Sequence, residues 1–387
     1  MRPSTEGFAF RVVCTDGSAR RSILTTPHGD VDLPTFMPVG TQGSVKGLTP
    51  DEVASTGARI VLGNTYHLML RPGAERIAEL GGLHGFTRWP HAMLTDSGGF
   101  QAFSLSAGSL KTSTPSLVTP SEEGFVFRSH LDGSKHQLTP ESAVEIQGKI
   151  GADIQMQLDV CPPGEAPRDA VERAVAMTTR WAERALATPR PPKQALFGIV
   201  QGGTHTDLRL RHAAELAAMV SEGRAFDGLA LGGFSVGEEI AAMRATLDAV
   251  ASALDPERPR YLMGVGTPQD LIHAIGTGVD MFDCVMPTRN ARNGQAFTRF
   301  GKIAIKQARW ATDPLPLDPD CSCPCCRGGF SRAYLRHLYL ANEMLVLRLL
   351  TLHNLWLYGE IMRGARDAIE RGAYSAWARE TLTRMEQ

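Results

Sequence analysis

The sequence lacks any apolar run long enough to cross a lipid bilayer, and Met1 to Glu6 contain no signal-peptide core. We therefore expect a cytoplasmic protein without a membrane partner. Internal repeats and low-complexity tracts are also missing, so a repeat protein is excluded. What is present is an ordinary globular composition: 387 residues, 43% hydrophobic and 21% charged. That length suffices for one large barrel and an appendage.

A large net charge of either sign is missing as well. The formal charge is −1, so the composition as a whole does not indicate a nucleic-acid partner. The charge is unevenly distributed, however: from Val285 to the C-terminus there are 15 Lys and Arg against 9 Asp and Glu. An asymmetry of this kind is expected if one end of the molecule meets phosphates. An ordinary charged helical surface would produce the same count.

Short apolar runs alternate with helical patterns along most of the chain. Eight such runs cover residues 35–39, 60–62, 92–95, 154–158, 196–200, 229–231, 261–263 and 281–284. Helices are predicted between them, at 166–187, 206–221, 237–254 and 267–275, and after Thr49-Pro50 and Thr139-Pro140, which have the pattern of a helix start. Eight strands alternating with helices predict a closed (β/α)8 TIM barrel of the α/β class.

Two segments interrupt this alternation. Residues 97–138 are rich in Ser, Thr and Gly and contain Asp132-Gly133, which predicts a β insertion with a hairpin after the third strand. After Phe297 a cysteine cluster precedes three helical patterns, at 332–350, 352–369 and 374–383. We therefore predict a catalytic barrel over residues 1–300 and a zinc-binding helical subdomain over 301–387 that packs on it.

Polar side chains follow several predicted strands at their C-terminal ends, where barrel enzymes carry their active sites. Three are carboxylates and one is a carboxamide: Asp96, Asp159, Asp283 and Gln201. The neighbouring Gly232 and Gly233 would let a ligand approach the backbone closely. Each polar residue alone could cap a turn, but four of them on separate strands favour a shared site.

The segment around Asp283 is the most informative. A buried strand has little reason to carry an unpaired carboxylate, because burying a charge is costly. We expect Pro287 to end the run and a basic loop with Arg289 and Arg292 to follow. A carboxylate beside a basic loop suits a nucleophile that faces a polyanion. A turn-capping Asp beside a solvated basic face is the alternative.

The other rim residues constrain the chemistry further. Paired carboxylates suit substitution at an anomeric carbon, where one attacks and the other handles protons. An Asp, a Gln and exposed glycine backbone can match the donors and acceptors of a purine-like base edge. Phe100 and Met263 could sandwich a flat ring, although each taken alone is more typical of plain barrel packing.

Four of the seven cysteines lie in one short segment. Three of them form Cys-x-Cys-x-x-Cys, and a histidine follows 27 residues after the last: Cys321, Cys323, Cys326 and His353. Three thiolates and one imidazole predict a closed tetrahedral site holding one structural zinc ion per chain. Two alternatives stay open, because Cys325 could replace Cys323 or Cys326, and His337 also lies downstream.

The motifs now described resemble those of the bacterial-type tRNA-guanine transglycosylases, the enzymes of queuosine modification. In family order they cover residues 95–101, 198–203, 232–238, 282–289 and the Cys-x-Cys-x-x-Cys…His pattern. The resemblance extends over essentially the whole chain, from Phe10 to beyond His353. The extra thiol of Cys325 departs from the family pattern. Archaeal relatives carry additional C-terminal RNA-binding domains, which we do not expect in this protein.

The resemblance implies a role for each site residue. Asp283 is the nucleophile on the ribose of the wobble guanosine, and Asp96 is the general acid/base. The base site comprises Asp159, Gln201, the Gly233 backbone, Ser97, Cys161, Phe100 and Met263. The nucleotides around the wobble position meet Thr288, Arg289 and Arg292.

The resemblance also implies a substrate and an assembly. The family, a group of pentosyltransferases, exchanges guanine for 7-aminomethyl-7-deazaguanine in bacteria and for queuine in eukaryotes. Cys161 is similar to the bacterial pattern, since the eukaryotic subunit has Val there. The implied tRNAs carry GUN anticodons within a U-G-U context, and the implied assembly is a homodimer.

Two other functions compete with this interpretation. A barrel hydrolase acting on nucleosides or glycosides would share the carboxylates but would release the base without incorporating another. The basic segment 289–292 disfavours it. A zinc-stabilised RNA-binding protein without catalysis would not need acids at the rim of a phosphate-binding face, where they repel the ligand.

Overall fold

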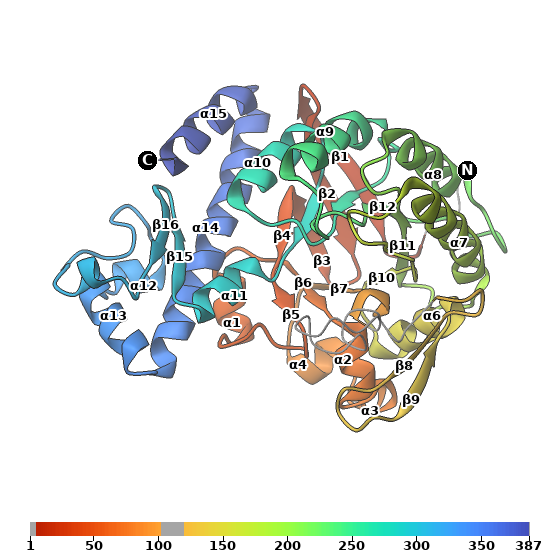
Figure 1. Ribbon diagram of the computed structural model, residues 1–387, viewed down its shortest axis with the longest axis horizontal. Coiled ribbons are helices and arrows are strands. Elements are labelled where there is room, and N and C mark those ends of the chain that lie inside the picture. Colours follow the sequence, from red (N-terminus) through yellow and green to blue (C-terminus); the bar gives the residue numbers. More distant parts are fainter. Residues whose placement is uncertain (1–4, 102–119, 387) are drawn as a thin grey trace.

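The computed structural model describes residues 5–101 and 120–386. Its centre is a parallel sheet whose strands follow the order β4-β14-β13-β12-β11-β10-β7-β6-β5 (Figure 1). These strands are β4 (Thr35–Met37), β5 (Val39–Gly40), β6 (Ile60–Gly63), β7 (Ala92–Thr95), β10 (Ile154–Met156), β11 (Ala195–Val200), β12 (Gly228–Leu231), β13 (Arg260–Leu262) and β14 (Met281–Asp283). Because β4 and β5 are pieces of one run separated by Pro38, the order returns to its start. The predicted TIM barrel is confirmed.

The strands are apolar because both of their faces are covered. All six residues of β11 are buried, and so are all four of β6, β7 and β12. One apolar cluster fills the barrel and includes Met37, Phe197 and Met281. A second cluster lies between the strands and the surrounding helices and includes Leu196 and Leu229. Such two-sided burial is typical of a parallel sheet.

The helices after Thr49-Pro50 and Thr139-Pro140 begin where the sequence predicts, whereas the helix predicted from residue 237 begins at Ile240. Thr49 and Thr139 each form a capping box, with a proline in the first turn of α1 and α6. The helices before the C-terminal region are α1 (Pro50–Ser55), α2 (Thr65–Leu70), α3 (Ala74–Glu79), α4 (Gly82–Thr87), α6 (Pro140–Ile150), α7 (Arg168–Ala187), α8 (Thr206–Ala218), α9 (Ile240–Val250) with η1 (Ala251–Ala253), α10 (Pro268–Gly276) and α11 (Met286–Arg292). None of the described helices is both long enough and apolar enough to span a membrane.

The prediction of a loop after Pro287 is wrong, because α11 occupies that segment. Pro287 lies in the first turn of α11, where a missing N–H costs nothing and the fixed φ favours the helix. The helix ends at Asn293, and both arginines of the predicted basic loop therefore lie on a helix that begins three residues after Asp283. Their positions relative to Asp283 are thus fixed by regular structure.

An antiparallel sheet that the sequence did not reveal covers the N-terminal end of the barrel. It consists of β1 (Ala9–Asp16), β2 (Ala19–Thr26) and β3 (Gly29–Leu33). Leu24, Val31 and Leu33 belong to the same apolar cluster as the barrel interior. The sheet therefore closes the end of the barrel opposite the strand C-termini.

The predicted β insertion is present as a hairpin of β8 (Phe125–Arg128) and β9 (Lys135–Leu138). Its connection contains Asp132-Gly133, as predicted, and Gly133 has a positive φ of 74°. Phe125 and Phe127 pack with Trp181 of α7 in a separate apolar cluster. Residues 102–119 of the predicted insertion lie outside the described residues.

The C-terminal helices differ from the prediction in one place. The elements are β15 (Gln295–Thr298), β16 (Gly301–Ala304), η2 (Ala308–Trp310), α12 (Pro324–Arg327), α13 (Arg332–Leu340), α14 (Met344–Glu370) and α15 (Tyr374–Met385). The predicted break near residue 351 is wrong, since α14 continues through it. The break lies at Asn342, whose φ of 56° is a left-handed conformation that asparagine tolerates. Because α14 packs on barrel and C-terminal elements alike, the boundary at residue 300 stays a prediction.

A buried ion pair ties the N-terminal sheet to the barrel. Asp280 immediately precedes β14 and is fully buried, and Arg20 of β2 is 4% exposed. Arg20 donates to Asp280 through Nε, at 3.0 Å, and through Nη2, while the Arg260 backbone N–H donates at 2.7 Å. Each charge is thus compensated inside the protein.

Replacing Asp280 with Asn should lower the free energy of unfolding by about 3–5 kcal/mol, because the buried Arg20 guanidinium loses its counter-charge. Urea denaturation of wild type and variant measures the difference. Glu75→Gln is the matched control, since the Lys149–Glu75 pair is 51% and 72% exposed. It should cost less than about 1 kcal/mol. An equal loss of unfolding free energy in the two variants would show that the buried pair stabilises the protein no more than the exposed pair does.

Candidate active site and metal cluster

The predicted site residues meet at one end of the barrel. Asp96 directly follows β7, Gln201 follows β11, Gly232 and Gly233 follow β12, Met263 follows β13, and Asp283 ends β14. Asp159 follows β10 by three residues. Since these strands are parallel and adjacent in the sheet, their C-terminal ends open on a common mouth.

Asp283 is held through one carboxylate oxygen only. Oδ1 accepts a hydrogen bond from the Tyr261 hydroxyl at 2.6 Å and from the Gly264 backbone N–H at 2.9 Å. Among residues 5–101 and 120–386, no donor reaches Oδ2. Burial raises the pKa of the Asp283 carboxyl, and the two donors oppose that rise. The carboxylate is therefore oriented by one oxygen and has the other free to react.

Asp96 is more deeply buried and is held at the start of α2. Oδ1 accepts from the Thr65 backbone N–H at 2.8 Å, and Oδ2 accepts from the Asn64 side chain at 2.5 Å. Burial is the main cause that raises the pKa of Asp96 to about 7, and the negative charge of Asp283 raises it further. The two carboxylates thus interact electrostatically across the mouth.

The positioning residues Asn64, Thr65 and Tyr261 were missed from the sequence. Asn64 and Thr65 follow β6 directly, so the criterion that found Asp96 could also have found them. Tyr261 lies inside β13 and is buried, like any core aromatic residue. Nothing in its sequence context distinguishes it, because its partner Asp283 comes from the next strand.

Asp159 and Gln201 form a hydrogen-bonded pair beside this centre. Gln201 Nε2 donates to Asp159 Oδ2 at 2.6 Å, and burial raises the pKa of Asp159 to about 6. Gln201 Oε1 is buried, and no partner for it exists among the described residues. Gly233 has a φ of 66°, and a Cβ there would lie 2.4 Å from Oε1. Only glycine allows this approach of backbone to amide.

A cavity of about 330 Å³ opens beside Asp159. Phe100 and Cys161 line it, together with apolar side chains such as Val160 and Met177. Burial raises the pKa of the Cys161 thiol to about 12, so the thiol stays neutral. Aromatic and aliphatic walls with a few polar groups at one end are typical of small-molecule sites. Three of the predicted base-site residues, Phe100, Asp159 and Cys161, therefore line this cavity, whereas Gln201 and Gly233 do not.

The remaining predicted base-site residues lie as follows. Met263 is partly buried and packs against the apolar cluster of the barrel interior. Ser97 is buried, and its Oγ accepts from the Gly99 backbone N–H at 3.3 Å. Neither of them lines the cavity beside Asp159. The sandwich of a base between Phe100 and Met263 stays a prediction.

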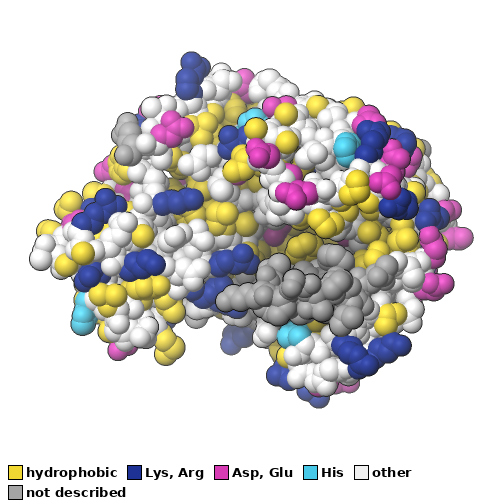
Figure 2. All heavy atoms as spheres, viewed as in Figure 1, with side chains coloured by type: hydrophobic (Ala, Val, Ile, Leu, Met, Phe, Trp, Pro, Cys, Tyr) yellow, Lys and Arg dark blue, Asp and Glu magenta, His cyan; other side chains and the backbone are white. Residues whose placement is uncertain are grey.

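The predicted RNA contacts lie on α11. Arg289 is exposed and Arg292 is half-buried, and burial together with the charge of Arg289 lowers the pKa of Arg292. Figure 2 shows Lys and Arg side chains over α11 and over the C-terminal elements beside it. Thr288 differs from its neighbours, because it is buried and its hydroxyl donates to Val285 O at 3.1 Å.

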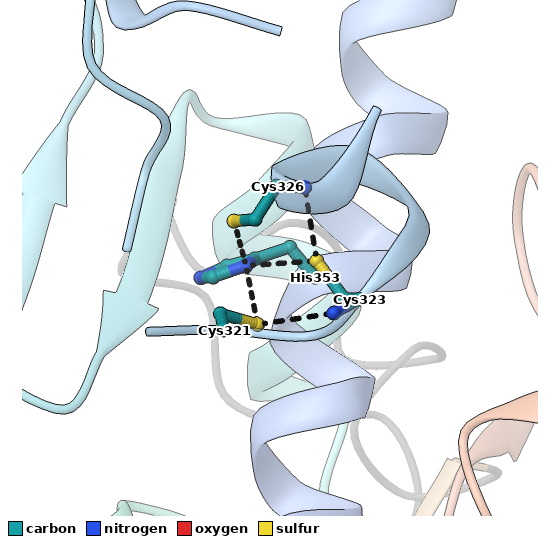
Figure 3. Close-up of side chains that lie close together, drawn as sticks. All are labelled: Cys321, Cys323, Cys326 and His353. Carbon is teal, nitrogen blue, oxygen red and sulfur yellow. Dashed lines mark hydrogen bonds between the residues drawn. The ribbon is translucent and has the colours of Figure 1, made fainter. Parts of the chain in front are cut away.

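The four predicted metal ligands converge, and all four are buried (Figure 3). His353 Nδ1 lies 3.7 Å from the Cys321 sulfur and 3.4 Å from those of Cys323 and Cys326. A tetrahedral ion bonded to nitrogen and sulfur implies N···S separations of about 3.6 Å. His353 Nε2 lies 2.8 Å from the Phe297 carbonyl and donates to it, which leaves Nδ1 as the ligand atom. The cluster could therefore hold a metal ion.

The convergence of the four ligand atoms favours the predicted set over the two alternatives. Cys325 is buried but is not among the four side chains whose ligand atoms converge, and His337 is exposed on α13. A second His/Asp group, formed by His28, His84 and Asp153, lies at the other end of the barrel. Its imidazoles are stacked 3.5 Å apart at 10°. Parallel rings do not aim their in-plane lone pairs at one ion, so this group is a hydrogen-bonded cluster.

Comparison with known proteins agrees with this geometry. The model of the family described as "Queuine tRNA-ribosyltransferase" matches residues 14–387. A protein of that name from Sorangium cellulosum is 68% identical over 98% of this chain and 92% of its own. Namesakes from Syntrophobacter fumaroxidans and Rhizobium meliloti are 52% and 50% identical over 96% and 98% of this chain, and 96% and 97% of theirs. The resemblance seen in the motifs is confirmed, and the chain belongs to the queuine tRNA-ribosyltransferase family.

Proposed function

We propose that this protein exchanges the wobble guanine of tRNAs with GUN anticodons for 7-aminomethyl-7-deazaguanine. The observation that carries the proposal is the pair Asp283 and Asp96 at the barrel mouth. One carboxylate has a free oxygen, and the other has a pKa of about 7 and can hold a proton near neutrality. Family membership supports the transfer of a ribosyl bond on tRNA.

The first half of the reaction breaks the bond to guanine. Asp283 Oδ2 attacks the anomeric carbon of the ribose, and the C1′–N9 electron pair leaves with guanine. Protonated Asp96 gives its proton to the departing base, which is the role of a general acid. The product of this half is a covalent ester between Asp283 and the ribose.

The second half reverses these roles. The deazaguanine enters the same pocket, and Asp96, now ionised, takes the proton of its N9. The N9 electron pair then attacks the anomeric carbon and releases the Asp283 carboxylate. The pKa of about 7 suits both halves, because the proton is retained below neutrality and is lost as the pH rises through 7. No redox or nucleotide cofactor takes part.

Asp159 and Gln201 are proposed to bind the base edge, with the Gly233 backbone. The N–H groups of a guanine-type edge would donate to Asp159, and the free Oε1 of Gln201 offers a further acceptor. Phe100 and Met263 would cover its faces, and Ser97 completes the base site. Cys161 supports 7-aminomethyl-7-deazaguanine over queuine as the incoming base, since the bacterial pattern has Cys here.

The cationic residues near the mouth are proposed to hold the anticodon loop around its U-G-U sequence. Arg289 and Arg292 lie on α11, directly after Asp283, where they can meet the phosphates that flank the reacting nucleotide. Thr288 belongs to the same segment. We further propose a homodimeric cytoplasmic enzyme with a catalytic barrel over residues 1–300 and a subdomain over 301–387.

Zinc is the proposed occupant of the Cys3His cluster. Three thiolates and an imidazole fill a tetrahedral shell, so no position stays open for a substrate. The ion would join the segment with Cys321, Cys323 and Cys326 to α14 through His353. Its role is therefore structural, with one ion per chain, and no step of the reaction uses it.

Incorporation of radiolabelled guanine into unmodified tRNA tests the proposed function. The wild type should incorporate the label and form a covalent tRNA adduct that survives denaturation. Asp283→Asn should bind tRNA but form no adduct, because an amide cannot attack the ribose. Asp248→Asn, an exposed change on α9, is the control and should behave like wild type. An adduct in Asp283→Asn, or release of base without incorporation by the wild type, would refute the mechanism.

Metal analysis of purified protein tests the zinc assignment. The wild type should contain one zinc ion per chain, and Cys323→Ser should lose it together with thermal stability, because a ligand is removed. Cys325→Ser changes the neighbouring buried thiol and should keep the full zinc content. Loss of zinc from Cys325→Ser, with zinc retained in Cys323→Ser, would show that the ligand set is assigned wrongly.

A further inference from the structure

Helix α8 carries two fully buried side chains whose charge and polarity the reaction itself does not use. Arg209 and His212 are both 0% exposed and lie almost one helical turn apart. Within the described part of the chain, Arg209 has no carboxylate partner, in contrast to Arg20, which pairs with Asp280. The negative charge of Glu238 acts on Arg209 without a direct ion pair. A buried cation without a directly paired carboxylate is costly, so its retention calls for another explanation.

The two side chains hold the same peptide unit from opposite sides. Arg209 Nη1 donates to the Val200 carbonyl at 3.2 Å, and the Gln201 N–H donates to His212 Nδ1 at 2.9 Å. The peptide that links β11 to the base-site residue Gln201 is therefore fixed at its carbonyl and at its amide. Burial lowers the pKa of His212 to about 4, so its ring is neutral near pH 7 and Nδ1 can accept.

The same guanidinium also reaches the next strand end. Arg209 Nη2 donates to the Gly233 carbonyl at 3.3 Å, and Nε donates to the Gly203 carbonyl at 2.6 Å. Its Cζ lies 3.8 Å from the centre of the Phe234 ring. One planar group thus connects the segments after β11 and β12, which carry the Gln201 amide and the Gly233 backbone.

The packing around Arg209 leaves little freedom. Gly202 has a φ of 150°, and a Cβ there would lie 2.6 Å from Arg209 Cγ. Three carbonyls in different directions require the fixed fork of a guanidinium, which a lysine ammonium cannot reproduce. These hydrogen bonds therefore fix the distance between the segments after β11 and β12. A residue that only filled the core would not need to donate to three carbonyls.

We propose that Arg209 and His212 are positioning residues that set the spacing between Gln201 and Gly233 and thereby the affinity for the base. They touch neither the base nor the ribose. The inference rests on the proposed function, in which Gln201 and the Gly233 backbone bind a guanine-type edge. Loss of either positioning residue should weaken binding of the free base far more than binding of tRNA.

The test measures guanine binding by calorimetry, and the KM values for guanine and tRNA in the exchange assay. Arg209→Lys and His212→Leu should each raise the Kd and KM for guanine about tenfold or more, with kcat and the KM for tRNA changed less than about twofold. A lost hydrogen bond to a base-site segment is of this size. His212→Asn keeps an acceptor where Nδ1 lies and should restore most of the affinity.

Arg260→Lys is the matched control, because Arg260 is also buried and donates to the carbonyls of Leu254 and Gly278. It should lower thermal stability without changing the Kd for guanine. Unchanged guanine affinity in folded Arg209→Lys and His212→Leu would overturn the proposal, as would an equal loss in Arg260→Lys or in His212→Asn.

Calorimetry separates this proposal from the proposed function. A wild type that binds guanine without exchanging it refutes the proposed function alone, and the Kd series still decides the positioning role. A wild type that binds no guanine refutes both.

Discussion

Two carboxylates that share a dry space cannot both be charged without cost, and the active end of this barrel depends on that constraint. In the proposed reaction Asp283 is ionised when it attacks, and its Oδ2 has no donor among the described residues. Asp96 is buried beside it, so it holds a proton up to a pH of about 7. Burial is the main cause of this raised pKa, and the negative charge of Asp283 adds to it. The sheet of β1, β2 and β3 covers the opposite end of the barrel.

The proposed RNA contacts and the metal cluster are connected to this centre through one helix. His353 of α14 points to the cysteines, and its neighbour Asn354 donates to the Pro287 carbonyl at 2.9 Å and accepts from the Phe297 N–H at 2.8 Å. Pro287 lies in the first turn of α11, which begins three residues after Asp283. A metal ion held by this cluster would therefore help to fix the arginines of α11 relative to Asp283.

The barrel, the hairpin and the position of the acids could be predicted because they follow from local sequence. Apolar runs, capping boxes and the Asp132-Gly133 turn predicted the barrel and its hairpin, and the position of each acid at a strand end predicted the mouth. Other features depend on contacts that are distant in sequence. The N-terminal sheet became visible only in the fold, because its apolar residues complete a cluster supplied by the barrel strands. Tyr261 binds Asp283 on the adjacent strand, and Arg209 binds three carbonyls at or just after the ends of β11 and β12. The helix α11 was missed because Pro287 was interpreted as a stop, although a first-turn proline favours a helix.

The central claim is that Asp96 and Asp283 interact within one pocket. The most direct measurement is a titration of the Asp96 carboxyl by carbon-13 NMR in the wild type and in Asp283→Asn. In the wild type the midpoint should lie near pH 7, well above the ordinary value for aspartate. In Asp283→Asn it should shift to lower pH, because no neighbouring negative charge then opposes ionisation, while burial keeps it above the ordinary value. An Asp96 midpoint that is the same in both proteins would contradict the account.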